Sequence, residues 1–97
     1  MAVIIGEVRT FPDARADKAQ VMKMFEETAE VFNALLNWEW SVSEGYDFAE
    51  EANIEHLIDE CADLIQATSN LLAGLGVDDM QPAMIACESR NRERGRL

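Results

Sequence analysis

Acidic residues in two short stretches have the types and the spacing to bind a cation. The stretch FEETAE contains Glu27 and Glu30, and the stretch DECAD contains Glu60 and Asp63, three positions apart in both cases. Residues three apart lie on one face of a helix, so each pair would present two carboxylates together. Ligands that are all oxygens favour a hard ion such as Mg²⁺ or Mn²⁺.

The placement of these pairs is more informative than their spacing. With 19 acids in 97 residues, the four acid pairs three apart in this chain are about what chance predicts. At about 100° per residue, however, Glu27 falls inside the apolar arc of its helix, between Ala34 and Trp38. Glu60 falls in the matching place on a second helix, and the second acid of each pair borders the arc. The pairs are therefore set in apolar surroundings.

Two long helices must position the pairs. The first is predicted from Asp17, an N-cap, to about Trp38, because this stretch is rich in Ala, Met, Leu and Glu and lacks Pro and Gly. The sequence SVSEGYD at 41–47 predicts a turn, with Gly45 able to take positive φ and Asp47 placed to cap the next helix.

A second helix is predicted from about Phe48 to Leu75, where GLGVDD ends it. Asp78 or Asp79 then caps a third helix with Pro82 in its first turn, where a missing N–H costs little. The fold class is therefore all-α, with two long antiparallel helices and a C-terminal helix.

The chain divides into an N-terminal arm, 1–16, and a helical domain, 17–97. The arm has a short apolar run followed by Gly and Phe-Pro-Asp, which favours extended or irregular backbone. A chain of 97 residues buries a modest share of its surface alone, and the apolar arc of the first helix is wider than one core needs. We expect a homodimer whose four long helices form a bundle, or a homotetramer.

A hairpin that folds about Gly45 sets the two acid pairs against each other. Glu27 comes level with Asp63, and Glu30 comes level with Glu60. Four carboxylates in an apolar seam carry a large desolvation and repulsion penalty unless they are protonated or bound to cations. The geometry leaves two interpretations open, a metal site and a solvated acidic helix edge.

The charge distribution excludes some partners. The net charge is −11, which argues against a nucleic-acid-binding surface, yet residues 88–97 carry +2 and leave −13 on residues 1–87. No stretch has the pattern of a signal peptide or the length of a membrane span. Cys61 and Cys87 lie in apolar helical patterns, so we expect buried free thiols in a reducing compartment, the cytoplasm.

The acidic pattern resembles a known pair of motifs. Glu26-Glu27-x-x-Glu30 followed by Glu60-x-x-Asp63 is similar to the paired motif of the MazG-like family of all-α nucleoside triphosphate pyrophosphohydrolases, which includes dimeric dUTPases. In that family the two motifs lie on neighbouring helices and supply the Mg²⁺ ligands. The resemblance implies a bound Mg²⁺, for which Mn²⁺ is a possible substitute, with Glu27, Glu30, Glu60 and Asp63 as its ligands. Glu26 would then contact these ligands and not the ion itself.

The C-terminal segment RNRERG extends the resemblance, which covers about residues 18–96. Family members commonly carry a Lys/Arg-Asn-x-x-Arg-Gly-like segment after the third helix, and Arg90, Asn91 and Arg94 match it. The resemblance implies that these residues hold substrate phosphates. Without the resemblance, the same segment is a cationic helix end favoured by the macrodipole, or a solvated terminus.

Two further residues are candidates for substrate binding. His56 stands where several relatives place a lysine, so a phosphate contact there would depend on pH, although a lone helical histidine is more often a surface or packing residue. Trp38 has the chemistry to stack on a base, but an aromatic side chain at a helix end more often packs in a core or an interface. Trp38 and Trp40 are two apart, so at most one of them faces a nucleotide.

The resemblance implies hydrolysis of a ribo- or deoxynucleoside triphosphate between its α- and β-phosphates, giving the monophosphate and pyrophosphate. Glu27, Glu30 and Glu60 are the predicted catalytic residues, and we expect the triphosphate to arrive as its metal complex. The alternative is a non-catalytic helical oligomeric protein, with an interaction or regulatory role, that retains the family fold. A di-iron carboxylate bundle is disfavoured because Glu-x-x-His motifs are missing.

Overall fold

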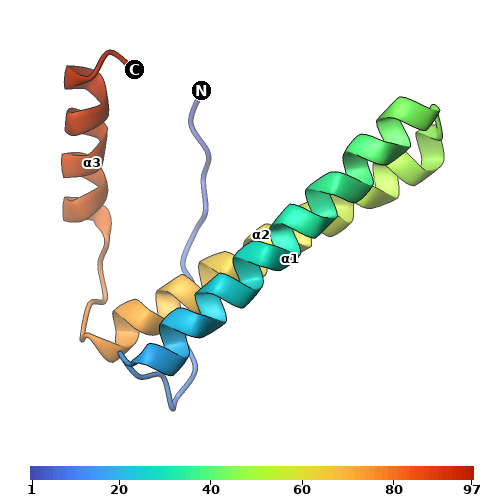
Figure 1. Ribbon diagram of the computed structural model, residues 1–97. Helices are drawn as coiled ribbons and strands as arrows, with labels where there is room; N and C mark the ends of the chain where they lie inside the picture. Colours follow the sequence, from blue (N-terminus) through green and yellow to red (C-terminus); the bar gives the residue numbers. More distant parts are fainter.

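Three α-helices make up the ordered elements of this chain. The computed structural model describes residues 1–97 and contains α1 (Lys18–Glu44), α2 (Asp47–Gly74) and α3 (Gln81–Glu93) (Figure 1). α1 and α2 pack side by side as an antiparallel hairpin, whereas α3 packs on neither of them. The expected all-α class, with two long antiparallel helices and a C-terminal helix, is confirmed. No helix is both long enough and apolar enough to cross a membrane.

The first helix is longer than the sequence predicted. α1 does not end near Trp38 but continues to Glu44, and Gly45, with φ of 73°, ends it. The hydroxyl of Ser41 donates to the carbonyl of Trp38 at 2.7 Å, and the hydroxyl of Ser43 donates in the same way to the carbonyl three residues before it. Because these bonds add to the helical backbone without replacing it, the serines do not break the helix. The predicted seven-residue turn therefore shrinks to Gly45 and Tyr46.

Of the predicted helix caps, Asp17 is confirmed, because its carboxylate accepts a hydrogen bond from the N–H of Gln20 at 2.9 Å. The cap predicted at Asp78 or Asp79 is wrong, because the N-cap of α3 is Met80, although the Asp79 carboxylate accepts a hydrogen bond from the N–H of Gln81 at 2.9 Å. Asp47 was wrongly predicted as a cap, because it is the first residue inside α2. An acid in this first turn still interacts favourably with the helix macrodipole.

The core of the hairpin is small. The buried side chains are Ala34, Ala67, Glu27, Ser41 and Asn70, so only two of them are apolar. The radius of gyration is 16.2 Å, against about 12.5 Å for a compact domain of this length. Part of the apolar arc on each long helix is therefore exposed, including Val21, Met22, Phe32 and Leu36 on α1 and Ile54, Cys61 and Ala62 on α2.

The openness of the fold also overturns the prediction of buried cysteines. Both thiols are free, but Cys61 is exposed and Cys87 is only half-buried. α1 covers part of the apolar arc of α2 and leaves Cys61 outside that contact. α3, which carries Cys87, packs on neither long helix.

The N-terminal arm is extended, as predicted, and is tied to α2 by side-chain amides. Asn70 accepts a hydrogen bond from the N–H of Phe11 at 3.1 Å, and the Gln66 amide donates to the carbonyl of Arg9 at 3.0 Å. At the end of α2, a Cβ added to Gly74 would overlap the backbone of Arg15 and Ala16. The arm therefore passes against α2 at a point where only glycine fits.

We predict that Gly74→Ala destabilises the protein by about 1–3 kcal/mol through overpacking against the arm. The same substitution in a chain that starts at Asp17 should stabilise by up to about 1 kcal/mol, because the clash is gone and alanine is the better helix former. Urea unfolding followed by circular dichroism measures both values. A gain of stability in the full chain would show that the arm does not lie against Gly74.

Candidate metal centre

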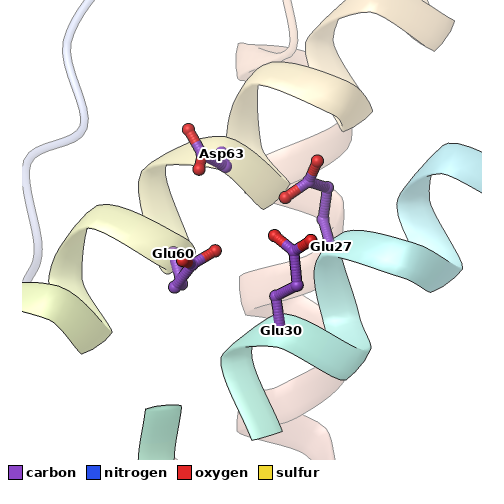
Figure 2. Close-up of side chains that lie close together, drawn as sticks. All are labelled: Glu27, Glu30, Glu60 and Asp63. Carbon is purple, nitrogen blue, oxygen red and sulfur yellow. The ribbon is translucent and has the colours of Figure 1, made fainter. Parts of the chain in front are cut away.

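Four carboxylates from α1 and α2 meet at the middle of the hairpin. One oxygen from each of Glu27, Glu30, Glu60 and Asp63 lies within 4.8 Å of the others. Figure 2 shows the four side chains arranged around a common space, two from each helix. The registration expected from the turn at Gly45 therefore brings the two motifs together. We call these four residues the carboxylate cluster.

The cluster combines buried and exposed ligands. Glu27 is 6% exposed, Glu60 is half-buried, and Glu30 and Asp63 are exposed. One oxygen of Glu27 and one of Glu60, the Oε2 atom of each, are buried and have no hydrogen-bond partner. A buried carboxylate oxygen without a partner is costly, and a cation bound in the cluster is one way to satisfy these two atoms.

Two basic side chains lie beside the cluster. The Lys23 ammonium is 3.1 Å from Glu27 Oε1, and this hydrogen bond and charge raise the pKa of Lys23. The His56 imidazole is 3.5 Å from Glu60 Oε1. The sequence analysis identified His56 but not Lys23. The position of Lys23 four residues before Glu27 on a helix predicts the contact between them.

The acids also interact with one another. A hydrogen bond to Glu60 raises the pKa of the Glu30 carboxyl above its ordinary value. The negative charges of Glu27 and Glu60 raise it further, and partial desolvation adds to them. Without a cation, the Glu30 carboxyl therefore keeps its proton to a higher pH than an isolated glutamate does.

The size and the donor set of the cluster fit a small hard cation. Oxygen ligands about 2.1 Å from Mg²⁺ lie about 3 Å apart when adjacent and about 4.2 Å apart when opposite. The ligand oxygens of the cluster are up to 4.8 Å apart, so the most widely separated ones must move inward by about half an ångström to match the distance between opposite ligands. Two exposed side chains, Glu30 and Asp63, are free to make that movement. A wider arrangement would suit two ions, which lie about 3.5–4 Å apart in two-metal sites.

The predicted phosphate-binding residues are not next to the cluster in the single chain. Arg90, Asn91 and Arg94 lie at the end of α3, which packs on neither α1 nor α2. Asn91 donates to Cys87 Sγ at 3.6 Å and accepts from Arg96 at 3.3 Å, so its amide is engaged within the C-terminal segment. The guanidinium groups of Arg90 and Arg94 are in exposed residues.

Trp38 lies on α1 about two turns beyond Glu30, toward the hairpin loop. It is half-buried, and its indole N–H is buried without a hydrogen-bond partner. Trp40 instead packs against Tyr46, with ring centroids 5.5 Å apart and planes tilted by 39°. Of the two tryptophans, Trp38 alone has a buried polar group that lacks a partner.

The chain was compared with family models, with curated proteins and with solved structures. None of the three comparisons gives a significant match.

We predict that Glu30→Gln stabilises the metal-free protein at neutral pH. Because the folded-state pKa of Glu30 is raised, its contribution to stability is present below the ordinary value of 4.5 and is lost as the pH rises through the raised value. The amide cannot ionise, so the variant avoids this loss. Urea midpoints at pH 4 and pH 7, in a chelating buffer, measure the difference.

The matched control is Glu55→Gln, which removes an exposed carboxylate from α2 outside the cluster. It should shift the urea midpoint less at pH 7 than Glu30→Gln does. Equal shifts would mean that the effect reflects the overall negative charge and not the cluster.

Proposed function

We propose that the chain is a Mg²⁺-dependent nucleoside triphosphate pyrophosphohydrolase. The observation that carries the proposal is the convergence of Glu27, Glu30, Glu60 and Asp63 with two buried carboxylate oxygens that have no partner. The resemblance of the two motifs to the MazG-like family supports the same conclusion. A reducing cytoplasm suits an enzyme with free thiols, and Mn²⁺ has the ligand preferences to replace Mg²⁺.

The residues of the carboxylate cluster would have different chemical roles. Bound Mg²⁺ would neutralise the triphosphate and lower the pKa of the attacking water. Glu27, Glu60 and Asp63 would supply the negatively charged oxygens that bind the ion. Glu30, which is exposed at the edge of the cluster, is the best placed to accept the proton of the water. The water oxygen adds to the α-phosphorus, the bond to the bridging oxygen of the β-phosphate breaks, and pyrophosphate leaves.

The substrate must overcome the negative charge of the chain. Residues 1–87 carry −13, so a triphosphate is repelled unless it arrives as a metal complex. Lys23 and His56 are the cationic or titratable groups nearest the cluster. Once a cation replaces the ammonium of Lys23 beside Glu27, this flexible side chain is free to contact a phosphate oxygen.

We also infer that the working unit is a homodimer, or a tetramer made from two such dimers. Along α1, the exposed residues Met22, Phe25, Ala29, Phe32 and Leu36 are spaced by three and four positions in turn. This is the spacing of a coiled-coil seam, and Phe25 and Phe32 are 63% and 58% exposed. A second copy that packs on this seam would give the hairpin the core that it lacks.

A non-catalytic interaction or regulatory protein is the second candidate. The observation that favours it is the breadth of exposed apolar surface, since surfaces of this kind bind other proteins. The two candidates differ in what they require of the cluster. An interaction protein has no need of a bound cation, so Mg²⁺ should not stabilise it.

We predict that the protein releases pyrophosphate from one or more triphosphates in a panel of ribo- and deoxynucleotides with Mg²⁺ or Mn²⁺. Glu60→Gln should lower this release by about 10²-fold or more, because it removes a cation ligand. The control is Asp59→Asn, an exposed acid adjacent in sequence but outside the cluster, which should retain activity. If folded protein with saturating metal releases none, the interaction protein is favoured.

We predict that Phe32→Glu converts the dimer to monomer, because it places a charge in the middle of the seam on α1. Analytical ultracentrifugation at micromolar concentration measures the mass. Phe48→Glu is the control, since Phe48 is 85% exposed in the first turn of α2 and lies off the seam. A wild-type monomer, or a Phe32→Glu dimer, would count against the inferred assembly.

A further inference from the structure

The N-terminal arm has an exposed apolar segment with the composition of a β-strand. Val3, Ile4 and Ile5 are 76%, 95% and 62% exposed, and the half-buried Val8 follows them. β-branched residues such as these are enriched in strands. No backbone N–H of residues 2–10 donates a hydrogen bond within the chain. Extended backbone with unpaired N–H and C=O groups is a template for a second strand.

Two side-chain amides of α2 bind one edge of the arm, as a neighbouring strand would. The Gln66 amide donates to the carbonyl of Arg9, and the Asn70 amide oxygen accepts from the N–H of Phe11. In extended backbone, the N–H and C=O groups of successive residues point to opposite edges. Since Arg9 and Phe11 face the amides, the peptide groups of Val8 face away from them. The arm therefore has one bonded edge and one free edge.

The free edge of the arm borders an open groove. Ile65 and Leu72 line this groove, which has a volume of about 1130 Å³, together with residues 5–10 of the arm and the start of α3. At about 100° per residue, these two residues lie on one side of Gln66, and Ala67, which is buried beside α1, lies on the other. The bonded edge is therefore on the α1 side, and the free edge is on the groove side. A strand added there would lie about 4.8 Å from the arm without displacing it.

The arm sequence is complementary to itself in one antiparallel register. With Val8 opposite the Val8 of a second copy, Glu7 of each arm lies opposite Arg9 of the other, so the ladder has two opposite-charge pairs. In an antiparallel ladder, hydrogen-bonded pairs alternate with non-hydrogen-bonded pairs. The Val8 pair exchanges two hydrogen bonds, and the Arg9 carbonyl is left facing away, where Gln66 already binds it. The register therefore keeps the contact between the arm and α2.

Neighbouring registers are disfavoured. A shift of the pairing by one residue would need the bonded edge of the arm, which Gln66 and Asn70 occupy. A shift by two residues uses the free edge but sets Glu7 opposite Glu7, or Arg9 opposite Arg9. Like charges directly opposite each other destabilise a ladder. The charges and the free edge together therefore select the Val8 register.

The ladder is too short to hold two chains together by itself. Gly6 has φ of 83°, which ends the extended backbone, and Pro12 has no N–H to donate. The regular pairing is thus limited to residues 7–10, and isolated two-stranded ladders are marginal in water. The arm lies on α2, whereas the seam inferred for the dimer faces away from α2, since Phe25 and the buried Ala34 are about 180° apart on α1. One chain is therefore able to make both contacts.

We propose that the free edge of the arm binds the arm of a second copy, antiparallel and with Val8 opposite Val8. Two dimers formed through α1 would be joined by these arm ladders into a tetramer, in which each two-fold contact supports the other. The pairing of the arms is independent of the proposed enzymatic function, whereas the tetramer also rests on the dimer inferred from the seam on α1.

A disulfide trap tests the register. Val8→Cys, in a background of Cys61→Ser and Cys87→Ser, places two thiols at a hydrogen-bonded pair whose Cα atoms are about 5.5 Å apart, which suits a disulfide. Mild oxidation should convert most of the protein to a covalent dimer on a non-reducing gel. The control is Thr10→Cys, which is half-buried on the same edge but lies opposite Gly6 in this register, and it should give little crosslink. Equal crosslinking of the two variants, or none, would overturn the proposal.

A charge exchange tests the pairing without oxidation. Glu7→Arg and Arg9→Glu should each convert the wild-type tetramer to dimer, because each sets like charges opposite each other, and the double variant should restore the tetramer. Sedimentation velocity at micromolar concentration measures the mass. A double variant that behaves like the single ones, or a wild-type assembly that Glu7→Arg leaves unchanged, would overturn the arm ladder. Phe32→Glu separates the two contacts, because an unchanged mass in that variant would overturn the seam on α1 and not the arm ladder.

Discussion

The packing of two acid pairs against each other across one helical hairpin is the constraint on which the rest of this structure depends. Glu27 is buried at the contact between α1 and α2, and Glu60 comes to meet it from the opposite helix. Like charges so close together oppose the packing that holds the helices together. Lys23 offsets part of this repulsion, and the raised pKa of Glu30 reflects the part that remains.

Sequence reasoning could place the cluster because its geometry depends on only two features, a turn at Gly45 and a regular helix on each side. The positive φ of Gly45 and the convergence of the four acids follow from these. The end of α1 was wrongly predicted because Ser41 and Ser43 resemble turn residues, while their hydroxyls bond within the helix. The exposure of Cys61 could not be predicted, since an apolar pattern shows which residues avoid water but not which segment covers them.

The hairpin is held together by close backbone approach more than by a large apolar core. Ala34 and Ala67 are its only buried apolar side chains, and the two helices are also joined by the Gln20 amide, which donates to the carbonyl of Ala67, and the Asn53 amide, which donates to the carbonyl of Asn37. Small residues at the contact let the two helices lie near enough for oxygens of the four acids to come within 4.8 Å of one another. The same small contact leaves several long apolar side chains of α1 facing outward, which is the basis of the homodimer proposed above.

The separation of acids and arginines onto different elements has a physical reason. If Arg90 and Arg94 packed beside Glu60 and Asp63 from the start of folding, they would pair with the carboxylates and compete with the cation for the same oxygens. In the single chain the two groups stay apart, because α3 packs on neither long helix, so the carboxylate oxygens of the cluster are not paired with guanidinium groups.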